Sequence, residues 1–101
     1  MKVPYIEDPI FEWNSNKDQI NIEKHSICFK DAIRVFYDKN RFLFADISHS
    51  TSTEQRWYCV GKIGNDICTV RFVVRNNVLR IIGAGYWRKE RKLYEKNTTK
   101  V

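Results

Sequence analysis

The residues that break regular structure are scarce in this chain. Its 101 residues include only 4 glycines and 2 prolines, whereas 14% of them are aromatic. Such a composition can bury enough apolar surface to fold, which argues against intrinsic disorder over most of the length. The length predicts a single domain, residues 1–101, with one core of modest size. Only the ends, an extended lead-in at 1–10 and a frayed tail at 98–101, are expected to lack regular packing.

Long apolar runs and a cysteine framework are also absent. Near the N-terminus the only apolar candidate segment is interrupted by Glu7 and Asp8, so neither a signal peptide nor a membrane span is predicted. The three cysteines are Cys28, Cys59 and Cys68. Their odd number, without framework spacing, favours reduced thiols in a cytoplasmic protein. His25 and His49 do not join these cysteines at a metal-ligand spacing, so neither a metal nor another cofactor is expected.

Acidic residues are scarce in the second half of the chain. The whole sequence holds 18 basic and 12 acidic residues, a net charge of +6. Up to Asn40, six basic and seven acidic residues leave a net charge of −1, and the rest of the chain carries +7. A basic half predicts an acidic partner, which is either a nucleic acid or an acidic protein. Composition does not distinguish the two.

The clearest local pattern is a β-hairpin over residues 67–83. Segments rich in β-branched and aromatic residues flank Asn76-Asn77, a pair that can adopt the positive φ angles of a type I′ turn. The pairs expected from a two-residue turn are Arg75 with Val78, Val73 with Arg80, and Arg71 with Ile82. The face expected to be core consists of Val70, Phe72, Val74, Leu79 and Ile81. The opposite face carries the guanidinium groups of Arg71, Arg75 and Arg80, which are either solvated charges or an anion site.

The remaining periodicity predicts an α+β fold with two N-terminal helices, an antiparallel sheet of about four strands and a C-terminal helix. The predicted helices cover residues 16–24, 29–37 and 87–97, and the predicted strands cover 41–46, 55–63, 67–75 and 78–83. Asn14 is the expected N-cap of the first helix, in which Asp18 faces solvent. The side chains expected to pack the first and last helices inward are Ile20, Ile22, Leu93 and Tyr94.

Three connections bear on function. Residues 47–53, which include His49, are predicted to form a loop without regular structure. A turn at Gly64-Asn65-Asp66 would close the hairpin between the second and third predicted strands, either as a two-residue loop that closes on Ile63 and Asp66 or as a three-residue loop that reverses which side chains face the core. The pairs expected from the two-residue loop are Tyr58 with Arg71 and Arg56 with Val73, while Trp57 and Cys59 point to the core. Residues 83–85, Gly-Ala-Gly, are expected to act as a hinge before the last helix.

An ordered set of residues along the chain resembles one family. The set comprises Phe11-Glu12-Trp13, Lys17, Asn21, Lys24-His25, Phe29, Ala32, Val35, Phe36, Glu54, Arg56, Gly61, Arg80-Ile81-Ile82-Gly83-Ala84, Glu90 and Tyr94. With these residues the chain resembles BrnT, the toxin of the BrnT–BrnA type II toxin–antitoxin systems, from Phe11 to Glu95. The resemblance implies a RelE-like fold and a ribonuclease that needs no metal and blocks translation. It also implies a hetero-oligomer with a BrnA-like antitoxin, which neutralises the toxin and supplies the DNA contacts when the complex represses its own operon.

The sequence departs from the family pattern at several positions. Ser26 stands where the family commonly has glycine, although glycine ends a helix in the left-handed conformation at lower cost. Gly83 stands in place of a serine, and Gly85 in place of an arginine. The segment 83–90 is also one residue shorter. If the family arginine holds the scissile phosphate, its loss leaves three alternatives, which are slow cleavage, use of Arg88 instead, or no catalysis.

Metal-free RNA cleavage needs a base for the 2′-hydroxyl proton, a cation for the charge on the phosphorane, and an acid for the leaving oxygen. The candidate catalytic residues are Arg56, Arg80, His49, Glu54 and Tyr58, with Tyr94 as a further candidate. The candidate RNA-binding residues are Arg71, Arg75, Arg88, Lys89 and Lys92. Arginine suits the phosphate because its planar fork binds two oxygens at once. The acid–base candidates also have structural interpretations, namely a solvated His49, a Glu54–Arg56 ion pair, a locally bonded Tyr58 and a core Tyr94.

Three hypotheses of function follow. In the first, the protein is an endoribonuclease toxin, and we expect Arg80→Ala to abolish toxicity while antitoxin binding survives. In the second, a non-catalytic homologue binds the antitoxin and acts in transcriptional autorepression, which the glycine at position 85 favours. The third, an RNA-binding module without a partner, is weaker because exposed strand edges in a small chain often need cover by another chain.

Overall fold

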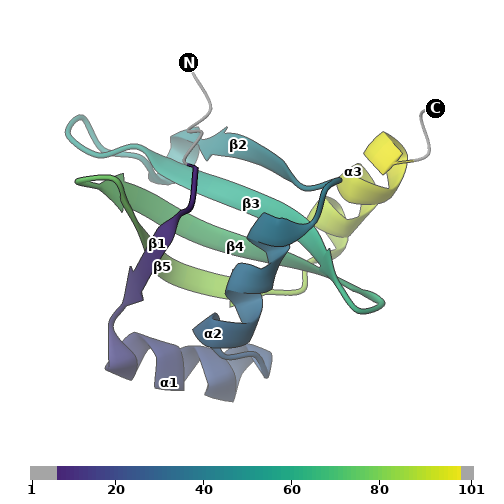
Figure 1. Cartoon of the computed structure of the whole chain (residues 1–101), viewed down its shortest axis with the longest axis horizontal. Coiled ribbons are helices and arrows are strands. Elements are labelled where there is room, and N and C mark those ends of the chain that lie inside the picture. The colour runs from purple at the N-terminus through teal and green to yellow at the C-terminus, as the bar shows by residue number, and fades with distance from the viewer. Residues whose placement is uncertain (1–6, 99–101) are drawn as a thin grey trace.

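The fold is built on a mixed five-stranded sheet (Figure 1). The computed structural model describes residues 7–98 of the chain. The strands of the sheet are β1 (Ile10–Trp13), β2 (Phe42–Asp46), β3 (Arg56–Ile63), β4 (Asp66–Arg75) and β5 (Val78–Gly85), in the order β1-β5-β4-β3-β2. The predicted antiparallel meander is confirmed for β2 to β5. The strand number is wrong, because β1 adds a parallel edge strand beside β5. A four-residue strand gives little periodicity, and its partner lies far along the chain.

Helices cover the two faces of the sheet unequally. They are α1 (Ser15–His25), α2 (Phe29–Ala32), the 3-10 helices η1 (Ile33–Tyr37) and η2 (Ile47–His49), and α3 (Arg88–Thr98). The predicted helix at 29–37 is therefore one α-helical turn followed by a 3-10 helix. In Figure 1, α1 and α2 lie against one side of the sheet, and α3 lies apart from them, next to β3 and β4. No helix within residues 7–98 combines the length and the apolar character needed to cross a membrane.

The main core lies between the sheet and the layer formed by α2 and η1. The sheet contributes Trp57, Cys59, Cys68, Val70, Phe72, Leu79 and Ile81, which pack against Phe29, Ala32, Val35 and Phe36. This packing confirms the predicted core face of the hairpin. Burial raises the pKa of both Cys59 and Cys68, the latter to about 12, so these thiols stay protonated at neutral pH. Cys28, Cys59 and Cys68 form no disulfide.

The first helix packs through polar side chains rather than through its isoleucines. Ile20 and Ile22 are 48% and 37% exposed, so the prediction that they face inward is wrong. The buried residue is Asn21, whose Nδ2 donates to Ile27 O at 2.9 Å and whose Oδ1 accepts from Ala84 N at 3.1 Å. Asp18, expected in solvent, is half-buried and accepts from a backbone amide of α2 at 2.8 Å. α1 packs through these polar side chains because each one bonds a backbone group that would otherwise be buried without a partner.

The predicted caps and turns are largely confirmed. Asn14 Oδ1 accepts from Lys17 N at 3.0 Å at the start of α1. Ser26 ends that helix in the left-handed region, with φ of 60°. Asn76 and Asn77 have φ of 52° and 65°, as a type I′ turn requires. The pairs that the structure confirms are Arg75 with Val78, Val73 with Arg80, Tyr58 with Arg71, and Arg56 with Val73.

One predicted pair is wrong because β5 contains a bulge. Arg71 lies opposite Gly83, not Ile82, since the register shifts between Arg71 and Phe72. A bulge leaves one residue unpaired and bends the strand locally. The bulge keeps Arg71 on the face opposite the core and brings the glycine beneath its side chain. The sequence pattern alone does not reveal the shift, because a continuous β-branched run fits either register.

Several predicted boundaries are also wrong. The Gly-Ala-Gly segment is not a hinge, because Ala84 and Gly85 pair with β4 and extend β5 to its end. Ile10, placed in the lead-in, begins β1, and Thr98, placed in the tail, ends α3 by donating to two carbonyl oxygens of the last turn. Leu93 is 41% exposed, whereas Tyr94 is 5% exposed as predicted. Residues 1–6 and 99–101 of these two predicted segments lie outside the described part of the chain.

Candidate active site

The sheet face opposite the main core is only partly covered. α3 packs on one end of it, where Tyr94 contacts Val60 and Ile67. Four arginines from β3, β4 and β5 lie on the same face, and we call this surface the arginine face: Arg56, Arg71, Arg75 and Arg80. The side chains lie on one face because residues two apart along a strand point the same way and the three strands are neighbours.

A cluster of Asp46, His49 and Tyr58 lies at the β2 side of this face. Asp46 ends β2 and is 6% exposed. Its Oδ2 lies 2.7 Å from His49 Nδ1, and its Oδ1 accepts from Ser48 Oγ at 3.0 Å. Tyr58, on the neighbouring strand β3, is close enough to the Asp46 carboxylate for each group to shift the pKa of the other. A buried carboxylate thus orients a histidine whose side chain is 56% exposed.

The segment after β2 is ordered by the same cluster. Ile47–His49 forms the 3-10 helix η2, so the prediction of a loop without regular structure is wrong at this point. Ser50 Oγ donates to Asp46 O at 2.7 Å and accepts from Arg56 N at 2.8 Å. These bonds tie the segment to β2 and β3 at once. The position of His49 is therefore fixed by side-chain-to-backbone bonds, which composition does not reveal.

The cluster lowers the pKa of Asp46 and raises the pKa of Tyr58. Burial raises the pKa of Asp46, but hydrogen bonds from Tyr58, Ser48 and His49 outweigh it, so the pKa lies below its usual value. Burial and the bond to Asp46 raise the pKa of Tyr58, which the nearby Arg71 lowers only in part. At neutral pH Asp46 is therefore ionised and Tyr58 is protonated. This combination supplies one fixed hydrogen-bond acceptor and one proton donor.

A hollow of about 240 Å³ opens beside the cluster. Asp46, Ser48 and Tyr58 line it from the sheet side, and Lys89, Glu90 and Leu93 line it from α3. Pockets that enclose small molecules are usually larger, roughly 300–1,000 Å³, so this one suits a phosphate or a ribose rather than a whole nucleotide. Of the candidate residues, Tyr58 and Lys89 line the hollow, whereas His49 is not part of its lining but contacts Asp46, which is.

Other candidate residues form ion pairs away from this hollow. Glu54 accepts from Arg75 Nε at 2.7 Å and from Arg75 Nη2 at 3.0 Å. This bond is the largest cause that lowers the pKa of Glu54, which makes its carboxylate a weaker base. Arg80 Nη1 lies 3.5 Å from Glu12 Oε1, at the side of the sheet where β1 pairs with β5. The expected Glu54–Arg56 ion pair is replaced by the pair with Arg75.

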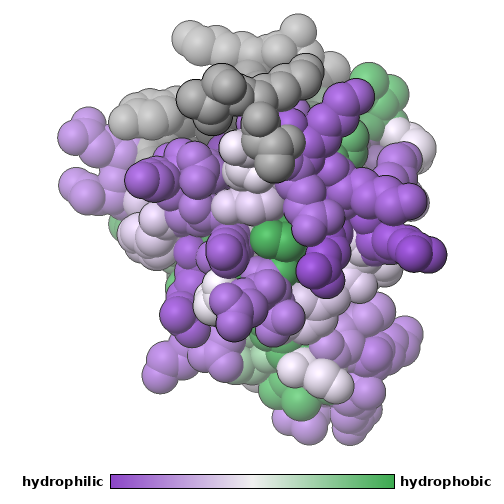
Figure 2. Space-filling model, turned by 90° about the vertical axis from the view of Figure 1, so that its right-hand side faces the viewer, coloured by the Kyte–Doolittle hydropathy of each residue, from purple (hydrophilic) through white to green (hydrophobic). Residues whose placement is uncertain are grey.

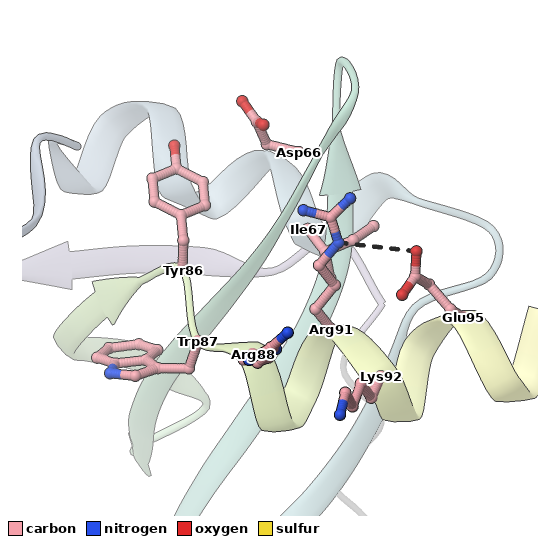
Figure 3. Close-up of a pocket in the computed structure, with 8 residues that line it drawn as sticks. All are labelled: Asp66, Ile67, Tyr86, Trp87, Arg88, Arg91, Lys92 and Glu95. Atoms are coloured by element: carbon pink, nitrogen blue, oxygen red, sulfur yellow. Dashed lines mark ion pairs between the residues drawn. The ribbon is translucent and has the colours of Figure 1, made fainter.

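A larger cavity, of about 610 Å³, lies at another side of α3 (Figure 3). It is lined by Asp66, Ile67, Tyr86, Trp87, Arg88, Arg91, Lys92 and Glu95. Arg88 and Lys92, two of the candidate RNA-binding residues, lie here rather than at the smaller hollow. The surrounding surface is mostly hydrophilic, as the view onto the α3 side of the molecule shows (Figure 2). The cavity brings cations and aromatic rings together, and neither it nor the smaller hollow is lined by a histidine.

A comparison with protein families adds an independent observation. Residues 13–90 of the 101 match the family described as the ribonuclease toxin BrnT of type II toxin–antitoxin systems. The chain belongs to the BrnT family. A comparison with curated proteins gives no match. The matched range confirms the predicted family and contains β2 to β5, with Asp46, His49 and Tyr58.

The structure explains why several residues of the BrnT pattern stand where they do. Asn21 joins α1 to β5 and to the segment between α1 and α2 through two buried hydrogen bonds. Gly61 lies under η1, where an added Cβ would sit 2.7 Å from Val35 O. His25 packs against Trp87 with the two rings tilted and their centroids 5.2 Å apart. These residues hold the two layers of this BrnT-family protein together, so matching the pattern does not by itself make them catalytic.

Sequence reasoning missed one residue of the candidate site, Asp46. The available signal was an acid at the end of a strand, three residues before His49, a spacing that brings both side chains together once a 3-10 turn forms. Tyr94, a further acid–base candidate, donates to Asp38 and packs in the core under α3. Within residues 7–98, no group of three or more His, Cys, Asp or Glu side chains is arranged to hold a metal ion.

Proposed function

We propose that this member of the BrnT family is an endoribonuclease that cleaves RNA without a metal ion and thereby inhibits translation. The reaction centre is the Asp46–His49–Tyr58 cluster together with the arginine face. The observation that carries this proposal is the 2.7 Å contact between the buried Asp46 carboxylate and Nδ1 of an exposed histidine. A carboxylate that holds Nδ1–H leaves the Nε2 lone pair free to accept a proton.

The proposed reaction is attack of a ribose 2′-hydroxyl on the adjacent phosphate. His49 Nε2 takes the hydroxyl proton, the 2′ oxygen bonds to phosphorus, and the bond from phosphorus to the 5′ oxygen breaks. Tyr58 is the proposed donor of the proton that the leaving 5′ oxygen needs; its raised pKa keeps it protonated and makes it a weaker acid than a free tyrosine. The products are a 2′,3′-cyclic phosphate and a 5′-hydroxyl end. Glu54 is the weaker candidate for the base because its ion pair with Arg75 lowers its pKa.

Two sets of cationic side chains support this reaction, one at the reacting phosphate and one at other phosphates of the RNA. Arg56, Arg71 and Arg80 on the arginine face stabilise the charge that builds on the phosphorane. The residues proposed to bind phosphates farther along the RNA are Arg75, Lys89, Arg88 and Lys92, the last two from the larger cavity. A chain with a net charge of +6 has the electrostatic character that such binding requires.

The partners proposed for this BrnT-family protein follow from the family. A BrnA-like antitoxin neutralises the toxin in a hetero-oligomer, and DNA is contacted only through that complex. We place the protein in the cytoplasm, where its RNA substrate lies, and assign it a RelE-like fold. An acidic antitoxin segment and RNA would both be attracted to the arginine face, so neutralisation by direct cover of this face is the simplest arrangement.

One observation favours a second function, a non-catalytic toxin homologue that acts in autorepression. Gly85 stands where the resemblance places an arginine, and Trp87 lies over it, so no cationic side chain reaches the site from this position. Under this alternative the protein binds its antitoxin but leaves RNA intact. The two functions differ in one measurement, which is cleavage by the protein alone.

The test is cleavage of a labelled RNA by purified protein in the presence of a metal chelator. Wild type should release fragments with 2′,3′-cyclic phosphate ends, and His49→Ala should slow this at least about 100-fold, as expected for loss of a general base. Arg34→Ala, a substitution at an exposed position of η1 outside the cluster and the arginine face, is the control and should cleave at the wild-type rate. Full activity of His49→Ala would refute the assignment, and an inert wild type that still binds the antitoxin would favour the second function.

A further inference from the structure

Two glycines of β5 are covered by side chains that leave no room for a Cβ. At Gly83, an added Cβ would lie 2.8 Å from Arg71 Nη2 and 3.1 Å from Arg71 Nε. At Gly85, it would lie 2.7 Å from the ring of Trp87. Neither glycine has a positive φ, so the reason for glycine here is space and not backbone conformation. The guanidinium group and the indole ring therefore occupy the volume that two side chains would otherwise fill.

The two covering side chains also contact each other. Arg71 Cζ lies 5.7 Å from the centroid of the Trp87 ring, within range of a cation–π interaction. The same indole packs against His25 at the end of α1, with ring centroids 5.2 Å apart. The order of contact is thus His25, Trp87 and Arg71, from the helical layer to the arginine face. These contacts favour one position of the guanidinium group before any ligand arrives.

Arg71 is held in place but its charge is not neutralised. Its Nε is buried and has no hydrogen-bond partner in the described part of the chain. Within residues 7–98 the structure pairs Arg75 and Arg80 of the same face with Glu54 and Glu12, whereas it gives Arg71 no carboxylate. The Nε–Nη2 edge faces Gly83, so an anion would meet the charge of the guanidinium group from another side.

Arg71 is also adjacent to the proposed reaction centre. It lies directly opposite Tyr58 across the β3–β4 pair, on the same face. Residues in such a pair have Cβ atoms about 5 Å apart. The guanidinium group extends from β4 over Gly83 of β5, and its charge still lowers the pKa of Tyr58 in part.

We infer that Arg71 is the residue of this chain that binds the scissile phosphate of RNA, and that Trp87, seated in the space left by Gly85, is a positioning residue for it. The inference rests on the proposed function, because it names the phosphate ligand of that same site. Gly83 and Gly85 then share one role, which is to leave space for the side chains of Arg71 and Trp87. Arg88 and Lys92 lie on α3 at the larger cavity instead and contact the RNA farther from the bond that breaks.

The test measures binding of a short 2′-O-methyl oligoribonucleotide, which cannot be cleaved, by fluorescence anisotropy at fixed salt. Arg71→Ala should weaken binding roughly 10- to 100-fold, as the loss of a charge-assisted bidentate contact does. Gly83→Ala keeps Arg71 but pushes its guanidinium group aside, and should weaken binding several-fold. Arg34→Ala, with the same loss of charge outside the arginine face, should change it less than about threefold. Equal effects of Arg71→Ala and Arg34→Ala would overturn the inference.

A second readout separates positioning from folding. Titration of inorganic phosphate should shift the Arg71 Nε–Hε resonance of the wild type, and the shift should be reduced in both Gly83→Ala and Trp87→Leu. An unchanged response in the two variants would remove the positioning role. Because neither readout needs cleavage, a wild type that binds through Arg71 but leaves RNA whole would refute the proposed function and leave the anion site standing. A wild type that cleaves RNA equally well with Arg71→Ala would refute this inference alone.

Discussion

The two sheet glycines Gly61 and Gly83 provide a matched pair of substitutions. An added Cβ would lie 2.7 Å from Val35 O at Gly61 and 2.8 Å from Arg71 Nη2 at Gly83. The distances are almost equal, but the obstructing atoms differ. Val35 is fully buried in η1 and its carbonyl belongs to the backbone, whereas Nη2 is the far end of a flexible side chain. Alanine should therefore be costly at Gly61 and nearly neutral for stability at Gly83.

The expected magnitudes follow from two opposing effects. Alanine in place of glycine within a strand gains about 0.5–1 kcal/mol from the lower entropy of the unfolded chain. Overpacking in a rigid core costs about 1–3 kcal/mol, toward the upper end where backbone must move. At Gly61 the η1 layer must move away from β3, for a net loss of about 2 kcal/mol. At Gly83 the guanidinium group rotates aside, and the net change should stay within about 0.5 kcal/mol.

Thermal unfolding followed by circular dichroism measures the difference. A loss of about 2 kcal/mol should lower the Tm of Gly61→Ala by about 10 °C, since each kcal/mol corresponds to about 4–8 °C in a domain of this size. Gly83→Ala should melt within about 3 °C of the wild type. Equal Tm changes in the two variants would refute the reasoning, because they would show that the identity of the obstructing atom does not decide the cost.

Three further predictions concern contacts that hold the layers together. Ser26→Gly should raise the free energy of unfolding in urea by roughly 0.5–1 kcal/mol, because Ser26 has a φ of 60° and glycine adopts this region without strain; no gain would contradict this. Asn21→Leu should cost roughly 2–4 kcal/mol in the same assay, because it leaves two buried backbone groups without partners, and a loss under 1 kcal/mol would disprove it. Tyr94→Phe should cost about 1–2 kcal/mol at pH 7 by removing the bond to Asp38. Although burial raises the pKa of Asp38, the Tyr94 bond helps hold it below its usual value, so this stabilisation is present above about pH 4 and is lost as the pH falls through the folded pKa. Unfolding curves at pH 7 and pH 3 that show the same difference between wild type and variant would exclude this linkage.

The local part of the candidate site could be predicted from the sequence. The turn at Asn76-Asn77 and the alternation of the flanking residues place Arg75, Val73 and Arg80 correctly. The turn at residues 64–65 likewise puts Tyr58 opposite Arg71. Both results depend on two-residue turns, which fix register over short distances. The alternation of residues therefore predicts the arginine face. It does not predict which arginine of that face takes part in the reaction.

The long-range part of the site could not be predicted in this way. The polar inward face of α1 is an example, because Asn21 is buried only when Ile27 and Ala84 offer it backbone partners. The Asp46–His49 contact is another, since it needs a 3-10 turn that side-chain bonds stabilise. A hydrophobic pattern reports how much apolar surface a segment carries, and it does not report which buried backbone groups need a partner.

The sequence by itself determined the α+β class, the BrnT family, the antiparallel meander and the face on which the arginines lie. Each of these depends on local periodicity, on turn residues or on an ordered set of residue types. Only the tertiary structure decided that β1 pairs with β5 as an edge strand, that a bulge places Gly83 under Arg71, and that Trp87 fills the space over Gly85. The physical reason is that close packing depends on where distant atoms meet, and a difference of one residue in register or one Cβ decides which side chain occupies the space.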